Sequence, residues 1–503
     1  GFIVWLVCLS RYFHRRSLTI SVSFPFWKRG VVVLVGACLI GLCIFGIRGR
    51  TGYNPIKVSA AYFCQDAFLN QLGVSPTFNL LTSVMDDMRP ENKYLHLMDE
   101  QEAITKAQAL LNRPGDANVS PLAVYRRAAK ADSVQQRRPN VVLIMMESMS
   151  AEFMKHFGQS ETLTPFLDSL YTRSISFRNF YSAGIHTNHG LYATLYSFPA
   201  MMKRNLMKGS VIPRYSGLPT VLKENGYYNL FFMTHEGQYD NMNAFFRTNG
   251  YDEVFSQEDY PADKVVNSFG VQDDFLYDYA IPVLNQRAAT GQPFFATLLS
   301  ISNHPPYVIP PFFHPKTSEP ETQIVEYADW ALRQFFEEAR KQPWFDNTIF
   351  VLEGDHGKLV GDAECELPES YNHIPLMIYS SRIQPEEKTT FGGQVDIQPT
   401  ILGLLNIDYL QNNFGVDLLK EERPCMFYTA DNMVVGRNDT LLYLYNYETQ
   451  QELTYDIGNG KLNAVPMDDS FLPLKEYSFS MLQSAEFLVK HGKTLNSIPF
   501  TQQ

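Results

Sequence analysis

Short apolar runs alternate with helix-like patterns between residues 138 and 420. Continuous apolar runs are typical of buried strands, and they predict strands at 140–146, 227–233, 294–301, 348–352 and 375–379. Apolar residues at three- and four-residue spacing predict helices at 164–173, 187–197, 218–225, 273–289, 324–341 and 398–405. This alternation predicts an α/β domain with a mostly parallel sheet that is sandwiched by helices.

The remaining parts of the chain have different patterns. Helix-like apolar spacing at 60–72 and 93–111 predicts a helical connector over residues 51–137. Strand-like runs at 425–428 and 440–445 predict a small antiparallel C-terminal subdomain over residues 421–503. We therefore expect four parts, with membrane segments in 1–50, the connector, the main domain over 138–420, and the C-terminal subdomain.

The first fifty residues contain two apolar stretches. Residues 31–47 form a run of 17 without a charge, which is short for a membrane-spanning helix; a buried core helix or an uncleaved signal is the alternative. Residues 2–8 resemble the end of another span. Because Gly1 already lies inside an apolar stretch, we expect a fragment of a multi-pass membrane domain that lacks its own N-terminus.

Basic residues set the expected orientation in the membrane. Five lie between the two apolar stretches, and three follow the second: Arg11, Arg15, Arg16, Lys28 and Arg29, then Arg48, Arg50 and Lys57. Loops rich in lysine and arginine stay in the cytoplasm. We therefore expect the chain after residue 50 to lie outside the inner (cytoplasmic) membrane.

Charge and cysteine content limit the partners. The net charge of −11, with no long basic run, argues against nucleic acid as the main partner. An anionic substrate stays possible, because a bound metal ion can supply positive charge locally. Outside the apolar segments, Cys64, Cys365 and Cys425 are too widely spaced for a zinc site; a bridge between Cys365 and Cys425 is left open.

Polar residues follow four of the expected strands directly. The strands end at Glu147, at Thr234-His235-Glu236, at Ser302-Asn303-His304 and at Asp355-His356. Parallel strands have their carboxyl ends at one edge of the sheet, which is where open α/β sheets bind ligands. One fold would therefore gather these side chains into a single site.

Glu147, Asp355 and His356 supply two carboxylates and an imidazole. A mixed set of oxygen and nitrogen ligands suits one divalent ion, with Mn²⁺, Mg²⁺ or Zn²⁺ as candidates. Each residue also has an ordinary structural explanation. Asp355 could cap a helix beside a surface His356 in a tight turn, and Glu147 could be a surface acid.

Thr187 is the candidate nucleophile. It lies in the polar loop 183–190, which runs into an apolar helix, so its hydroxyl would lie at a helix N-terminus. Coordination to a divalent cation would lower the pKa of that hydroxyl. The alternative is that Thr187 is only a helix cap.

Six motifs in order resemble a known family. They are residues 140–148, the Thr187 loop, 302–307, 354–357, 372–376 and 394–400. Together they resemble the lipoteichoic acid synthase and phosphoglycerol transferase group of sulfatase-like enzymes in the alkaline phosphatase superfamily. The resemblance covers about residues 138–420 and implies an alkaline phosphatase/sulfatase-like fold for this part, as the catalytic domain.

The resemblance also implies a mechanism. One Mn²⁺-like ion would be held by Glu147, Thr187, Asp355 and His356, outside the cytoplasm. Thr187 would attack a phospholipid of the phosphatidylglycerol type and release diacylglycerol, and an envelope glycan or lipid would then accept the head group. His304 matches the family's substrate-binding histidine, and it could either bind the phosphate or assist proton transfer. His373 matches another position near the site.

The chain departs from the family pattern in two places. The Thr187 loop lacks the Cys-x-Pro-x-Arg-like setting of true sulfatases, which argues against sulfate-ester hydrolysis. The Trp-x-Arg that binds glycerol phosphate in the family falls on residues 240–242, which are Asp-Asn-Met. Arg247 could replace the lost charge, or it could be a solvated helix residue, and His189 could be a replacement substrate contact. Structural roles stay open for His189 and its polar neighbours His186, His235 and Glu236.

Three other functions are compatible with these motifs. The same fold and metal could transfer phosphoethanolamine, or hydrolyse a phosphodiester with water as the acceptor. A catalytically silent envelope protein is the alternative of a different class. The full set of Glu147, Thr187, Asp355 and His356 argues against the silent protein, because such a relative would be expected to lose at least one of them.

Overall fold

The computed structural model describes residues 25–51, 54–64, 66–89, 92–126, 138–209 and 212–495, together with residues 8, 10–12 and 14. The chain divides into two compact units, Gly1–Lys57 and Val58–Gln503. The apolar stretch expected at 2–8 lies, apart from Cys8, outside the described residues. The finer division into four parts stays a prediction.

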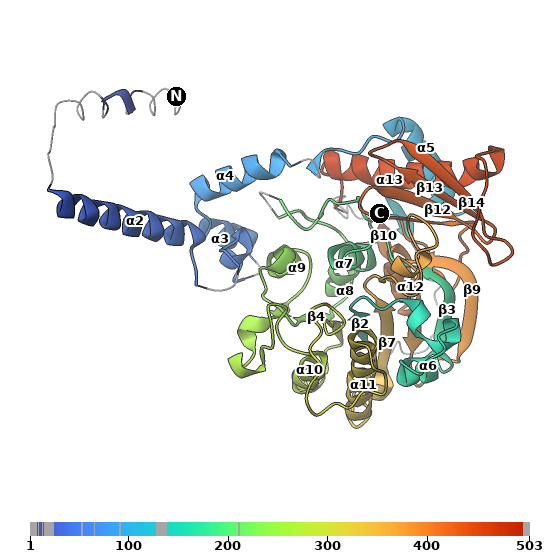
Figure 1. The fold of residues 1–503 in the computed structure, drawn as a ribbon. Helices are drawn as coiled ribbons and strands as arrows, with labels where there is room; N and C mark the ends of the chain where they lie inside the picture. The colour runs from blue at the N-terminus through green and yellow to red at the C-terminus, as the bar shows by residue number, and fades with distance from the viewer. Residues whose placement is uncertain are drawn as a thin grey trace. The chain divides into compact units, whose positions relative to one another are not determined.

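Helix α2, Phe26–Arg48, dominates the first unit (Figure 1). Its 23 residues include no buried side chain. At 1.5 Å per residue the helix is about 35 Å long, enough to cross the roughly 30 Å hydrocarbon core of a bilayer. Within the part of the chain that the structure describes, it is the single helix long and apolar enough to cross a membrane.

An eight-stranded sheet forms the centre of the second unit. Its order is β5 (Glu253–Phe255), β4 (Tyr228–Met233), β6 (Phe294–Leu299), β2 (Asn140–Met146), β7 (Thr348–Gly354), β8 (Leu376–Tyr379), β3 (Ile175–Tyr181) and β9 (Glu386–Gly393). Strand β8 runs antiparallel to both of its neighbours, and all other adjacent pairs are parallel. The mostly parallel sheet predicted from the sequence is therefore confirmed.

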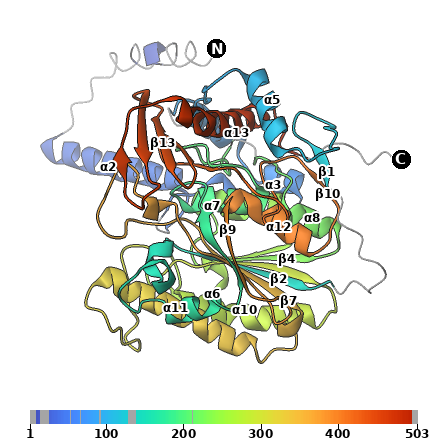
Figure 2. The ribbon, with the colours of Figure 1, turned by 90° about the vertical axis from the view of Figure 1, so that its right-hand side faces the viewer.

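Helices cover both faces of this sheet (Figure 2). One layer contains α6 (Pro165–Tyr171), α10 (Asp273–Ala288) and α11 (Pro320–Ala339); the other contains α7 (Thr187–Tyr196), α8 (Leu218–Glu224) and α12 (Ile397–Leu404). Strand β2 contributes to both cores, because alternate side chains of a strand point to opposite faces. Leu143 packs in the core on the α7 side, and Ile144 packs in the core on the α10 side.

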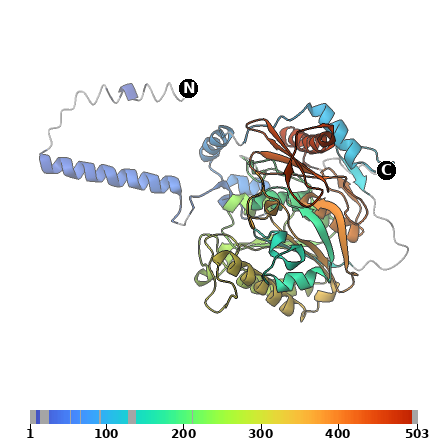
Figure 3. The ribbon, with the colours of Figure 1, turned by 45° about the vertical axis from the view of Figure 1, so that its right-hand side comes forward.

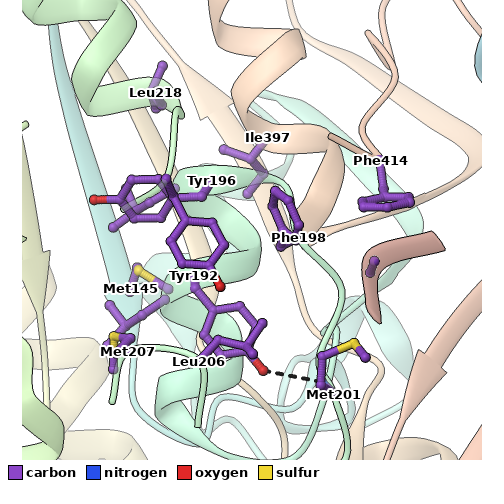
Figure 4. Close-up of a cluster of buried hydrophobic side chains, with 14 of the residues drawn as sticks. Met145, Tyr192, Tyr196, Phe198, Met201, Leu206, Met207, Leu218, Ile397 and Phe414 are labelled. Atoms are coloured by element: carbon purple, nitrogen blue, oxygen red, sulfur yellow. Dashed lines mark hydrogen bonds between the residues drawn. The ribbon is translucent and has the colours of Figure 1, made fainter. Parts of the chain in front are cut away.

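Helix α7 packs closely against the sheet (Figure 4). Asn188 to Tyr196 are all buried, which is unusual for a helix of ten residues. Tyr192 and Tyr196 pack in the same core cluster as Met145 of β2. The Met201 amide also donates a hydrogen bond to the Tyr192 hydroxyl at 3.3 Å. The N-terminus of α7 therefore has a fixed position relative to the strand ends.

The C-terminal part forms the predicted antiparallel subdomain. Its five-stranded sheet has the order β11 (Met426–Thr429), β12 (Met433–Arg437), β13 (Leu441–Asn446), β14 (Gln451–Asp456) and β15 (Asn463–Ala464). Helix α13 (Leu472–Lys490) packs on this sheet and lies beside α5 (Glu100–Leu111), as Figure 3 shows. Strand β1 (Val124–Arg126) pairs antiparallel with β10 (Tyr409–Gln411).

The connector differs in detail from the prediction. The helix expected at 60–72 is interrupted, and the structure has a short 3-10 helix at Val58–Ala61 and helix α3 at Ala67–Leu72. Helix α4, Pro76–Asp87, was not predicted.

The cysteine bridge that the sequence left open is absent, because Cys365 and Cys425 are both free thiols. The Cys365 thiol instead donates to the carbonyl oxygen of Leu367 at 3.1 Å.

Candidate active site

The carboxyl ends of β2 and β7 and the start of α7 meet at one place. Glu147 follows β2, and its amide donates to the Ser300 hydroxyl at 3.0 Å. Asp355 follows β7, and its amide donates to the carbonyl oxygen of Met146 at 3.0 Å. Thr187 is the first residue of α7. The sequence had placed Glu147 and Asp355 at one sheet edge, and the structure has them there.

Three of these side chains form a compact cluster. His356 Nε2 lies 3.7 Å from Glu147 Oε1 and 3.6 Å from Asp355 Oδ2. One ligand atom from each of the three residues lies within 4.8 Å of the others. The Thr187 hydroxyl donates to Glu147 Oε2 at 3.4 Å. All four residues predicted to hold the metal are therefore brought together.

Hydrogen bonds orient the cluster. Asp355 Oδ1 accepts from the amides of Ser148 at 2.8 Å and His356 at 2.7 Å, whereas its buried Oδ2 has no hydrogen-bond partner in the described part of the chain. His356 Nδ1 lies 2.8 Å from the carbonyl oxygen of Gly357. A carbonyl oxygen only accepts, so Nδ1 carries a proton, and Nε2 faces the two carboxylates.

The electrostatics of the cluster favour a cation. Burial, together with the neighbouring Asp355 carboxylate, raises the pKa of Glu147 well above its usual range. Both carboxylates are almost completely buried. Buried carboxylates of this kind are stable when they coordinate a metal or carry a proton. The donor set, the unpaired Asp355 Oδ2 and the orientation of His356 all fit a divalent metal ion.

Helix α7 packs very closely against the end of β7, next to the cluster of Glu147, Asp355 and His356. A Cβ atom at Gly190 would lie 2.2 Å from the carbonyl oxygen of Asp355, so only glycine allows α7 to approach β7 so closely. Gln394 links the end of β7 to the loop that precedes α7. Its Nε2 donates to that same carbonyl oxygen at 2.8 Å, and its Oε1 accepts from the Ala183 amide at 2.9 Å.

A cavity of about 730 Å³ opens beside the cluster. Glu147, Thr187, His304 and His356 line it. Nδ1 of His304 lies 2.6 Å from the carbonyl oxygen of Pro305, so the proton is on Nδ1 and Nε2 carries a lone pair. Burial lowers the pKa of His304, which favours the neutral ring. The cavity is large enough for a lipid head group.

Lys358 also lines the cavity, and the sequence analysis missed it. Its Nζ donates to Asn303 Oδ1 at 2.6 Å and to the Tyr307 hydroxyl at 3.3 Å, and it lies 5.2 Å from the ring centre of Phe153. Burial lowers its pKa to about 8. The sequence shows only that Lys358 follows the 354–357 turn directly, and it does not show which way the chain runs after that turn. Lys358 supplies a positive charge where an anionic substrate would bind.

Three residues predicted to contact substrate do not line the cavity. His189 is fully buried, and neither ring nitrogen has a hydrogen-bond partner among the described residues. His373 bonds to Glu152 Oε1 and to the carbonyl oxygen of Arg178, both at 2.9 Å. Arg247, in α9 (Met242–Thr248), donates to Asn243 Oδ1 at 2.8 Å. Their substrate contacts stay predictions.

Asp240, at the place of the family's missing tryptophan, does line the cavity, next to Tyr239. Its φ of +44° is rare for a residue with a side chain. Asp240 Oδ1 lies 2.8 Å from Lys208 Nζ. This wall of the cavity therefore carries a carboxylate that is paired with a lysine. Of the polar neighbours, His186 pairs with Asp431 at 2.7 Å, and His235 and Glu236 are buried.

Comparison with known proteins supports this description. A family model described as Sulfatase matches residues 139–407, more than half of the chain. Lipoteichoic acid synthase 1 of Bacillus subtilis is 25% identical over 350 residues, which are 64% of this chain and 53% of that protein. The chain therefore spans about half the length of this curated relative.

Two solved structures share the fold. A protein in the alkaline phosphatase superfamily from Vibrio parahaemolyticus matches with a TM-score of 0.71 at 26% identity, over 80% of this chain and 98% of that chain. The lipoteichoic acid synthase LtaP from Listeria monocytogenes matches with a TM-score of 0.61 at 21% identity, over 71% and 93%. The alkaline phosphatase-like fold that the resemblance implied is confirmed.

Proposed function

The chain belongs to the sulfatase family, and we propose that it is a membrane-anchored, metal-dependent phosphotransferase. It moves a glycerol-phosphate-type head group from a phospholipid of the phosphatidylglycerol type to an envelope glycan or lipid. The observation that carries the proposal is the meeting of the Thr187 hydroxyl with Glu147, Asp355 and His356 beside one cavity.

Glu147, Asp355, His356 and Thr187 would hold one divalent cation. Mn²⁺ is the first candidate, and Mg²⁺ and Zn²⁺ suit the same mixed donor set. When bound, the ion would supply the positive charge that lowers the pKa of the Thr187 hydroxyl and stabilises charge on the phosphoryl oxygens. The residues themselves contribute the buried negative charge and a fixed imidazole that hold it there.

Thr187 is the nucleophile. A bond forms between its Oγ and the lipid phosphorus while the bond from phosphorus to the diacylglycerol oxygen breaks. Diacylglycerol leaves as an alcohol, with the proton that the Thr187 hydroxyl has lost. In the second half, an acceptor hydroxyl attacks the phosphothreonine, and its proton ends on Thr187 Oγ. Threonine in place of the cysteine or serine of sulfatases supports phosphoryl transfer over sulfate hydrolysis.

His304 and Lys358 complete the machinery. Because the His304 ring is neutral and Nε2 carries a lone pair, that nitrogen accepts the proton of the attacking hydroxyl and returns it to the leaving oxygen. Lys358 pairs with the phosphate of the donor lipid. Both side chains line the cavity that contains Thr187.

The membrane setting follows from α2. A helix of this length and composition, directly before the second unit, would anchor the catalytic domain outside the cytoplasm. The relatives' printed name, lipoteichoic acid synthase, supports glycerol phosphate as the transferred group and the cell envelope as the location.

The test is release of labelled diacylglycerol from phosphatidylglycerol and, in parallel, from phosphatidylethanolamine. The full chain and Thr187→Ala are compared in Mn²⁺ and in chelator. We expect metal-dependent release from phosphatidylglycerol that Thr187→Ala abolishes. A preference for phosphatidylethanolamine would replace the head group in the proposal. Release that survives Thr187→Ala would overturn the nucleophile, and no release from either lipid would favour the silent protein.

A further inference from the structure

Helix α4 exposes its apolar side. Five large apolar side chains of this helix and its C-cap are 49–77% exposed: Leu80, Leu81, Val84, Met85 and Met88. Their spacing of three and four residues places them on one face of the helix. A helix packed on a soluble domain normally turns such a face toward the core.

The opposite face of α4 is polar and less exposed. Asn79, Thr82, Ser83 and Asp86 are half-buried. The Thr82 hydroxyl also bonds to the carbonyl oxygen of Phe78 at 3.0 Å, within the helix itself. The distribution of polar and apolar residues is therefore inverted relative to a surface helix of a soluble protein.

The exposed apolar side chains are concentrated in one short segment. Of the seventeen large apolar residues that are exposed among the described residues of the second unit, eight fall between Phe63 and Met88; besides those of α4 they are Phe63, Leu69 and Leu72. Single exposed apolar residues are normal on a protein surface, but a contiguous group marks an interaction site. We name these eight residues the apolar segment. Helix α4 lies at the edge of the second unit (Figure 1).

We infer that the apolar segment lies on the surface of the phospholipid bilayer that α2 crosses. Only residues 49–57 separate α2 from the start of the second unit. Nine residues span at most about 30 Å, so the start of the second unit stays close to the membrane surface, and α3 and α4 are the first α-helices after that start. An amphipathic helix with leucine, valine and methionine on one face binds the boundary between head groups and acyl chains.

Docking of α4 on the membrane would keep the cavity close to its lipid substrate. This consequence rests on the proposed function, in which the donor is a phospholipid. The donor cannot leave the bilayer at low cost, so the cavity must come to the lipid. A helix on the membrane surface restricts the second unit to a layer close to the head groups. The tether alone would let it move through a much larger volume.

The first test is photocrosslinking in the full chain. The protein is reconstituted in vesicles of phosphatidylglycerol and phosphatidylethanolamine that contain a phospholipid with a diazirine near its glycerol. We expect lipid adducts on residues 76–88 as well as on α2. The double variant Leu81→Glu/Met85→Glu should lower the adducts on 76–88 at least about fivefold and leave those on α2 unchanged. Glutamate is a good helix former, so α4 should keep its structure.

Phe312→Glu is the matched control, since Phe312 is also exposed, at 56%, but lies outside the apolar segment. On the lipid donor the double variant should turn over about tenfold more slowly than Phe312→Glu, with equal rates on a soluble aryl phosphodiester.

Absence of lipid adducts on 76–88 in the wild type would overturn the inference, as would adducts to a second copy of the chain instead of lipid. Equal lipid turnover in both variants would also contradict it. Failure of the proposed chemistry is distinguishable, because the crosslinks do not require activity.

Discussion

The Thr187 hydroxyl donates to Glu147 Oε2 across 3.4 Å, although forty positions separate the two residues in the chain. Glu147 comes from the end of β2 and Thr187 from the start of α7, so the contact exists only in the folded sheet. It places a hydroxyl directly beside two buried carboxylates and an imidazole. The predictions below examine the parts of this arrangement one at a time.

Removing only the hydroxyl at position 187 should abolish turnover. Thr187→Val keeps the size and branching of the side chain, and we expect kcat to fall on the order of 10³-fold or more, as for other lost nucleophiles. Thr187→Ser keeps a hydroxyl and should retain measurable activity.

Mass spectrometry of the quenched wild type should find a phosphorylated peptide that contains residue 187. An unmodified peptide under rapid turnover would contradict the covalent route.

Metal ions should stabilise the folded protein, independently of activity. At a metal concentration a hundredfold above the dissociation constant, the gain is about 2.7 kcal/mol, seen as a higher Tm. Glu147→Gln should lose this gain, because one buried carboxylate ligand is gone. Glu161→Gln changes a carboxylate that lines the cavity but is not part of the cluster, and it should keep the gain. Equal metal-dependent shifts in both variants would refute the ligand assignment.

Lys358 should affect binding of the anionic donor more than the chemical step. Loss of its charge in Lys358→Met should raise KM for the lipid about tenfold, the effect expected from a charge-assisted hydrogen bond of about 1.5 kcal/mol. Lys358→Arg keeps the charge and should stay within a few fold of the wild type. A fall in kcat with unchanged KM would instead place Lys358 in the transition state.

The pair of His373 and Glu152 should make stability depend on pH. Burial alone would lower the pKa of His373, but the hydrogen bond to Glu152 and the charges of Glu152 and Glu369 outweigh it, so the pKa is raised above 6.5. A raised histidine pKa contributes stability below pH 6.5 that is lost as pH rises through the folded pKa.

Denaturant titrations of Glu152→Gln check this relationship. The substitution should cost about 1 kcal/mol below pH 6.5 and less in alkaline solution. A cost that does not change with pH would mean that His373 keeps one charge state over the whole range.

Gly190→Ala should lower stability although alanine favours helices. Its Cβ would lie 2.2 Å from the carbonyl oxygen of Asp355 and 3.0 Å from Gln394 Nε2, and neither can move without disturbing the site. Overpacking of this kind costs about 1–3 kcal/mol, which exceeds the gain of about 1 kcal/mol in helix propensity. We expect a lower Tm and a weaker metal-dependent shift. An unchanged Tm would show that α7 can retreat from β7.

In the eight-stranded sheet, the sequence predicted the strands that are buried on both faces and missed the more exposed β3, β5 and β9. In the C-terminal sheet it missed β12 although all five of its residues are buried. Strand β2 was predicted with its observed bounds. All seven of its residues are buried, and the six that follow Asn140 form a continuous apolar run. Strand β9 begins with Glu386-Glu387-Lys388 and lies at the sheet edge, where polar side chains reach solvent and leave no apolar run. The antiparallel direction of β8 could not be predicted, because the pattern of apolar residues does not show which strands pair or in which direction they run.

The same distinction holds for the site. Glu147, Asp355 and His356 follow buried strands directly, so strand ends alone located them. Lys358 carries no such signal, because its position depends on how the chain turns after Gly357. Arg247 lies one turn beyond the expected position, but its guanidinium binds Asn243 and the carbonyl oxygen of Val254 instead of facing the cavity.

The segments that line the cavity are of two kinds: those that carry the reactive side chains and those that form two of its walls. The reactive side chains come from the ends of β2, β6 and β7 and the start of α7. The wall that contains Tyr239 and Asp240 follows β4, and the wall that contains Glu321 and Thr322 belongs to the first turn of α11. Substitutions in these two walls leave the reactive groups in place. Descendants of one ancestral enzyme could therefore diverge in the head group or acceptor they select while inheriting the same chemical step unchanged.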